Sequence, residues 1–111
     1  MTSLGTIERD HSSATGRTEW IHLIDSHPQL SQVADKQGIN PFTKGAMEYK
    51  AARDCAHVLV EGIEIGMIHW AMDDSQRLVV WSAAGAEAQV AAVAENVASR
   101  LGWRYVREDS A

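Results

Sequence analysis

The chain has few of the residues that mark specialised classes of protein. It contains one cysteine and two prolines, and it has no long run of apolar residues. A single cysteine excludes an intrachain disulfide, so a disulfide-stabilised secreted domain is not expected and a reducing cytoplasm fits best. Residues 1–16 lack an apolar stretch and carry Glu8 and Asp10, which argues against a signal peptide or a membrane span. We therefore expect a cytoplasmic protein.

Positive charge is also scarce. Ten Lys and Arg residues stand against fifteen Asp and Glu residues, which leaves a formal net charge of −5. An acidic chain is repelled by phosphate backbones, so nucleic acid is not an expected partner. The three arginines that gather near the C-terminus, Arg100, Arg104 and Arg107, are typical of the positive charge found at a helix end.

What is present indicates one folded domain. The 111 residues are 45% hydrophobic and 23% charged, close to average globular usage. That length suits a single core of ordinary size. Residues 1–17 are rich in Ser, Thr and Gly without a sustained apolar period, so we expect a flexible lead there, a domain over 18–107 and a polar tail over 108–111.

The most informative stretch covers residues 54–82. Its apolar residues alternate, and the alternation breaks at Glu61-Gly62 and again at residues 73–75. This pattern predicts a three-stranded antiparallel meander. A two-residue turn at Glu61-Gly62 pairs Val60 with Ile63, and counting outward puts five large apolar side chains on one face. They are Val58, Val60, Ile63, Ile65 and Met67.

The same count leaves other apolar residues on the opposite face of the sheet, among them Leu59, Ile68 and Trp70. A small antiparallel sheet usually keeps one face in water, so apolar groups on both faces indicate a second cover. The cover comes from this chain, with Trp20 and its helix as the candidate, or from a partner.

Two helices are expected. Trp20, Ile21 and Ile24 lie within a helix over Thr18–Ser26, which His27-Pro28 ends. The stronger helix spans residues 86–101, because Val90, Val93, Ala94, Val97 and Leu101 recur at helical spacing. Gly102 is suited to its C-terminal cap.

The remaining segments are shorter. Leu30–Val33 is either a short strand or a crossing segment, and 35–45 is a polar connection. Alternation at Met47 and Tyr49 predicts a brief edge strand, and residues 103–106 predict a last strand. The expected fold is α+β: an antiparallel meander of three to five strands, with the long C-terminal helix on one face and a short N-terminal helix.

One candidate for catalysis is the pair Asp54 and His69, which this register places opposite each other on neighbouring strands. A carboxylate beside an imidazole favours the charged ring and orients it as a base. No third member accompanies the pair, and a plain cross-strand polar pair at the end of the core face is the favoured interpretation. A small hydrolase or isomerase that uses His69 and Asp54 is the alternative function.

The sequence predicts no cofactor and no metal site. The histidines lack the tight spacing of metal ligands, because His22 and His27 are five residues apart across a helix end. His57 and His69 are treated in the same way, as solvated or individually hydrogen-bonded residues.

A contact surface is the remaining candidate site. Tryptophan is enriched at the centres of protein interfaces, and an acidic rim selects basic partners. The residues predicted to bind a partner are Trp70, Asp73, Asp74, Glu64, Ile68 and Trp81. A homodimer through the second sheet face is an open alternative.

The segment Gly38-Ile39-Asn40-Pro41-Phe42-Thr43, followed by Tyr49-Lys50-Ala51 and by a hairpin at Val60-Glu61-Gly62 with Gly66 and Trp70, resembles small bacterial proteins whose function is unassigned. The resemblance covers about the last eighty residues and implies a compact α+β domain. It carries no catalytic residues over to these positions. Many small acidic bacterial proteins of this kind are immunity or inhibitor partners of toxins. We therefore expect a small acidic protein-binding domain, in its most specific form an inhibitor or immunity-type partner of a basic bacterial protein.

Overall fold

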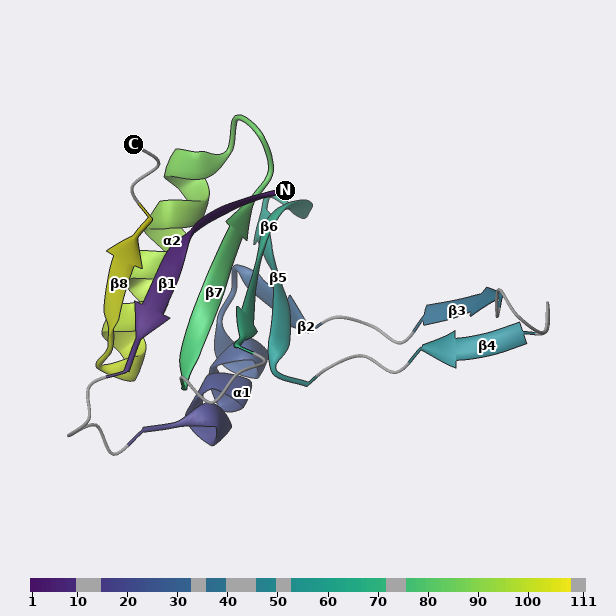
Figure 1. The fold of residues 1–111 in the computed structure, drawn as a ribbon, viewed down its shortest axis with the longest axis horizontal. Coiled ribbons are helices and arrows are strands. Elements are labelled where there is room, and N and C mark those ends of the chain that lie inside the picture. Colours follow the sequence, from purple (N-terminus) through teal and green to yellow (C-terminus); the bar gives the residue numbers. More distant parts are fainter. Residues whose placement is uncertain (10–14, 33–35, 40–45, 50–52, 72–75, 109–111) are drawn as a thin grey trace.

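The computed structural model describes residues 1–9, 15–32, 36–39, 46–49, 53–71 and 76–108. Six antiparallel strands form the main sheet in the order β2-β5-β6-β7-β1-β8, and both helices lie on one of its faces (Figure 1). The strands are β1 (Thr2–Glu8), β2 (Leu30–Gln32), β5 (Cys55–Val60), β6 (Ile63–Trp70), β7 (Arg77–Ser82) and β8 (Arg104–Arg107). The helices are α1 (Arg17–Ser26) and α2 (Glu87–Leu101). The α+β class is confirmed, but the sheet has more strands than the expected three to five.

The N-terminal segment corrects one expectation. Thr2–Glu8 was predicted to belong to a flexible lead, and instead it forms β1, which pairs with β7 on one side and β8 on the other. The pairing with β7 shifts register between Ser3 and Gly5, so Leu4 and Ile7 are both buried although they are three positions apart. A strand with a bulge loses the alternation of two that reveals a strand in a sequence.

The meander is present, but its register differs from the prediction. Val60 pairs with Ile63 as expected, and an extra residue in β6 then shifts every pair from Val58 back to Cys55. Val58 lies opposite Gly66, Ala56 opposite Ile68 and Cys55 opposite His69. A shift of one residue moves each β6 side chain to the other face of the sheet.

The corrected register moves the core. Ile68 is fully buried on the helix-covered face, whereas Met67 is only half-buried on the other face and Ile63 is 65% exposed. We expected α2 to pack on a face that includes Ile63, Ile65 and Met67. This is wrong for Ile63 and Met67, and of the three only Ile65 packs against the core.

The helices occupy the positions predicted for them. The buried side of α2 consists of Val90, Val93, Ala94, Val97, Ala98 and Leu101. Its close approach depends on Gly66, where a Cβ atom would come within 2.5 Å of the Trp81 carbonyl oxygen and 2.9 Å of Val90 Cγ2. In α1, Trp20 is fully buried and its indole N–H donates to the Asp54 carbonyl oxygen at 2.8 Å. Gly102 ends α2 in the left-handed conformation with φ 73°, as its position predicted.

A second, two-stranded antiparallel sheet stands apart from the main one. It consists of β3 (Lys36–Ile39) and β4 (Ala46–Tyr49), and it projects away from the sheet and helices (Figure 1). The polar connection predicted over 35–45 is therefore wrong at Lys36–Ile39. The strand predicted around Met47 and Tyr49 exists, but it pairs with β3 and not with the main sheet. Residues 40–45 of the proline-bearing segment lie outside the described part.

Candidate functional site

The face of the main sheet opposite the helices is not covered by any helix or strand among the described residues (Figure 1). We call it the open face. Residues at the centre of this face alternate along each strand with the buried residues of the core, and these central residues are half-buried. Its centre consists of Cys55 and His57 of β5, Met67 and His69 of β6, and Val79 and Trp81 of β7.

Two aromatic rings form a flat plate in the middle of the open face. Trp81 Nε1–H donates to His69 Nε2 at 2.8 Å, and the two ring planes differ by 14° with centroids 6.4 Å apart. Rings that are joined at their edges and nearly parallel lie side by side, so neither ring covers a π face of the other. Aromatic faces of this kind bind apolar groups and cations.

The hydrogen bonds of His69 determine its tautomer. An indole N–H can only donate, so His69 Nε2 is the acceptor, and the Trp70 carbonyl oxygen 2.9 Å from Nδ1 can only accept. The ring is therefore neutral and carries its proton on Nδ1. Its one basic lone pair is already used by Trp81, which leaves no atom for accepting a substrate proton.

Asp54, the other member of the predicted pair, is engaged elsewhere. Its carboxylate accepts a hydrogen bond from Arg17 Nε at 2.9 Å, and its carbonyl oxygen accepts from the Trp70 amide at 3.0 Å. His69 lies opposite Cys55 instead. The register on which the pair of Asp54 and His69 was based is therefore wrong, because of the extra residue in β6.

The residues predicted to bind a partner are divided between the two faces. Trp81 and Glu64 belong to the open face, and Glu64 Oε1 lies 2.7 Å from His57 Nδ1. Ile68 is in the core, and Trp70 packs against Trp103 on the helix side with ring centroids 6.0 Å apart. Asp73 and Asp74 lie outside the described residues.

Sequence reasoning missed the central part of the open face. Met67 was expected in the core, and His57 and Val79 were not among the residues predicted to bind a partner. The alternation in Arg77–Ser82 was a usable signal, because its buried residues are Leu78, Val80 and Ser82 and the residues between them face outward. No comparable signal in the sequence reveals the extra residue in β6.

Two further histidines lie within the described residues, His22 on α1 and His27 at its end. His27 is buried, its Nδ1 accepts from the Gln29 amide at 3.0 Å, and its Nε2 lies 2.8 Å from Asn96 Oδ1. It therefore links the end of α1 to α2, whereas His22 is exposed on α1. In the described part of the chain, no three or more His, Cys, Asp or Glu side chains are grouped so that they could hold a metal ion.

Cys55 is the only thiol of the open face and of the chain. Burial raises the pKa of this thiol, and the nearby carboxylates of Asp54 and Glu64 raise it further. The thiol is therefore protonated at neutral pH and is a weak nucleophile, which suits a contact residue better than a catalytic one.

Comparisons of the chain with protein-family models, with curated proteins and with solved structures gave no match. In the part of the chain that the structure describes, no helix has the length and apolar character needed to cross a membrane. The functional conclusion therefore depends on the geometry of the site.

Proposed function

We propose that this protein is a small acidic protein-binding domain that docks a basic protein on the open face, in its most specific form as an inhibitor or immunity-type partner. The observation that carries the proposal is the plate of Trp81 and His69 on a sheet face that no described helix or strand covers. Antiparallel sheets commonly expose one face, but that face is then polar. Here Met67, Val79 and Trp81 provide an apolar centre instead.

The charge of the protein supports a basic partner. The net charge is −5, and two exposed carboxylates lie at the end of the β5–β6 hairpin, Glu64 on the open face and Glu61 in the turn next to it. A cationic side chain above the Trp81 ring gains a cation–π interaction, and the surrounding negative charge accelerates the encounter. An aromatic centre with charged surroundings is the usual composition of a protein interface.

The alternative enzyme function has no comparable support. It needs His69 as a base beside Asp54, and the hydrogen bonds described above use the free lone pair of His69 and direct Asp54 to Arg17. Binding without catalysis is the function that the geometry favours.

The test uses two variants that add the same charge on opposite sides of the protein. Val79→Glu adds a carboxylate in the centre of the open face, and Ala92→Glu adds one on the exposed side of α2. Each tagged protein is used for affinity capture from an extract of the source organism. A basic protein retained by the wild type and by Ala92→Glu, but not by Val79→Glu, is the expected result.

The captured protein is then titrated against purified variants. Trp81→Ala should weaken binding by at least about tenfold, since truncation of an aromatic residue at an interface centre commonly costs about 2 kcal/mol or more. The affinity should fall as salt is added. If Val79→Glu retains the partner as strongly as the wild type, the binding surface lies elsewhere. If size-exclusion chromatography shows a dimer that Val79→Glu disrupts, the open face is covered by a second copy and the proposal of a basic partner is wrong.

A further inference from the structure

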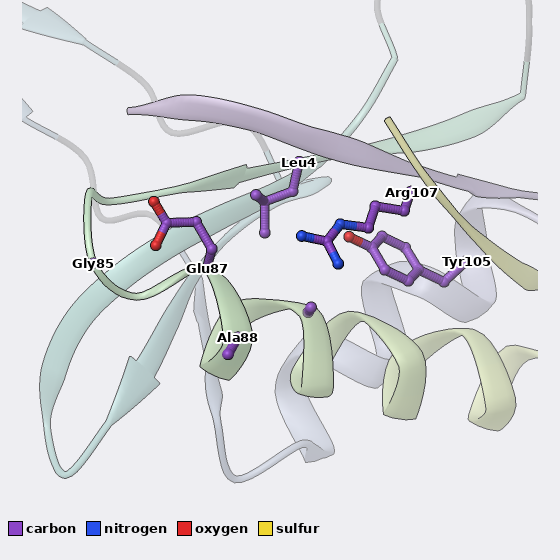
Figure 2. A pocket seen from close by; sticks show the side chains of 7 residues that line it. Leu4, Gly85, Glu87, Ala88, Tyr105 and Arg107 are labelled. Carbon is purple, nitrogen blue, oxygen red and sulfur yellow. The ribbon is translucent and has the colours of Figure 1, made fainter. Parts of the chain in front are cut away.

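A cleft lies on the helix side of the sheet, away from the open face, where α2 begins and β8 ends (Figure 2). Its volume is about 330 Å³, at the lower end of the range for small-molecule sites. The lining residues come from β1, the start of α2 and β8: Leu4, Gly85, Glu87, Ala88, Ala91, Tyr105 and Arg107.

The cleft has a positive and a negative side. The guanidinium of Arg107 and the hydroxyl of Tyr105 point toward each other on one side, and Glu87 lies on the other side with its carboxylate directed away from Arg107 (Figure 2). The structure gives no ion pair for Glu87 or Arg107 with any residue that it describes. Two opposite charges thus line one cleft without neutralising each other.

Tyr105 adds a third polar group to the lining of the cleft. Its hydroxyl oxygen is buried and has no hydrogen-bond partner within the described structure. Burial raises the pKa of Tyr105, so the hydroxyl keeps its proton at neutral pH and can donate a hydrogen bond. A buried hydroxyl without a partner is uncommon in folded proteins, and a ligand oxygen beside Arg107 would supply the missing acceptor.

Between the two charged sides the cleft is apolar. Leu4 comes from β1, and Ala88 and Ala91 lie on the same side of α2 about one turn apart. The two alanines leave room above the helix, so methylene groups fit there and remove apolar surface from water.

From this arrangement we infer that the cleft binds a short aliphatic ω-amino acid, a zwitterion whose carboxylate pairs with Arg107 and Tyr105 and whose ammonium pairs with Glu87. The separation of Glu87 from Arg107 favours a ligand with charges at its two ends over an α-amino acid, in which the charges are adjacent. The cleft and the open face are on different sides of the sheet, so this inference is independent of the proposed protein partner.

The probe is 5-aminopentanoate, titrated into the isotope-labelled full chain and followed by the backbone amide signals in NMR spectra. Three matched compounds isolate each feature of the ligand: pentanoate lacks the ammonium, pentylamine lacks the carboxylate, and 2-aminopentanoate has the same atoms with adjacent charges. We expect saturable shifts at Leu4, Ala88 and Arg107 with the probe. Each matched compound should bind at least about tenfold more weakly, because each lacks a charged pair in the correct place.

Protein variants test the same contacts from the other side. Arg107→Gln and Glu87→Gln should each weaken binding of the probe by about tenfold or more, and Tyr105→Phe should weaken it by a few-fold. Arg104→Gln is the matched control, because Arg104 lies on the same strand with its side chain on the opposite face of the sheet. The affinity of this variant for the probe should equal that of the wild type. Ala88→Met, at an exposed helical position, should narrow the cleft and also weaken binding.

Three results would overturn the inference. Absence of saturable shifts would show that the cleft does not bind this class of compound. Equal binding of pentanoate, together with an unchanged affinity of Glu87→Gln, would show that Glu87 only stabilises the first turn of α2, as carboxylates at helix N-termini do. If Arg104→Gln and Arg107→Gln lose the same affinity for the probe, general electrostatic attraction explains the binding and the specific site does not.

Discussion

The substitution Gly66→Ala tests the closest contact between the sheet and α2. Gly66 lies opposite Val58 in β5 and Ser82 in β7, in the interior of the sheet. The new methyl group would lie 2.5 Å from the Trp81 carbonyl oxygen, and 2.9 and 3.2 Å from the two γ-carbons of Val90. All of these separations are shorter than the roughly 3.5–4.0 Å at which carbon atoms attract each other.

The loss of unfolding free energy depends on which neighbouring groups can move. Val90 is fully buried and cannot rotate away, and displacement of the Trp81 carbonyl strains the pairing of β6 with β7. Overpacking a core costs about 1–3 kcal/mol in general, and the backbone contact places this site at the upper end, near 3 kcal/mol. For a domain of this size that loss lowers the melting temperature by roughly 10–20 °C.

The assay is urea and thermal unfolding followed by circular dichroism, with Gly16→Ala as the control. A Cβ atom at Gly16 meets only Glu19 Oε2, at 3.8 Å, so the control should lose less than about 1 kcal/mol. The double variant with Val90→Ala should lose less than the sum of the two single losses, because removal of the valine methyls relieves part of the overlap. Strict additivity, or a stable Gly66→Ala protein, would refute the packing of α2 on β6.

Three further predictions concern stability and reactivity. Val93→Asp should lower the unfolding free energy by about 3 kcal/mol or more, because Val93 is buried on the inner side of α2 and the new carboxylate has no partner; an unchanged urea midpoint would contradict this position of the helix. The pKa of Glu19 is lowered chiefly by the hydrogen bond from the Gly16 amide, 2.7 Å from Glu19 Oε2. Because the pKa of Glu19 is lower in the folded state, its carboxylate stabilises the fold at pH values above the unfolded-state pKa of about 4.3, and this stabilisation is lost as the pH falls. The difference in unfolding free energy between wild type and Glu19→Gln should therefore shrink in acid. A difference that grows in acid would contradict this sign. Alkylation of Cys55 by iodoacetamide should rise with pH at a higher midpoint in the folded protein than in urea, since burial raises the pKa of the thiol, and coincident midpoints would show that the thiol is not desolvated.

Local patterns were sufficient for the helices and the hairpin turn. The stripe of Val90, Val93 and Val97 predicts α2 because a helix of this length repeats its inner face every three or four residues. The turn at Glu61-Gly62 was also predicted correctly, with Val60 opposite Ile63, since few residue pairs accommodate the positive φ angles of 53° and 77° found there.

The candidate site was predicted only in part. Trp81 and Glu64 were named as contact residues and do lie on the open face, whereas Ile68 and Trp70 were placed there and instead lie on the helix side. The error has one cause, the extra residue in β6. It turns the side chain of every later residue in that strand to the other face of the sheet. His69 as the partner of Trp81 could not be inferred without that register.

The sequence by itself determined the elements whose signals are local, namely two helices with their ends and the hairpin turn, together with an acidic composition. Only the tertiary structure decided that Thr2–Glu8 joins the sheet between β7 and β8, and that Trp81 and His69 share its open face. The physical reason is the range of the interactions. Helix periodicity and turn conformation depend on residues a few positions apart, whereas strand pairing joins residues as distant as Ile7 and Tyr105, and bulges change its register without leaving a periodic trace.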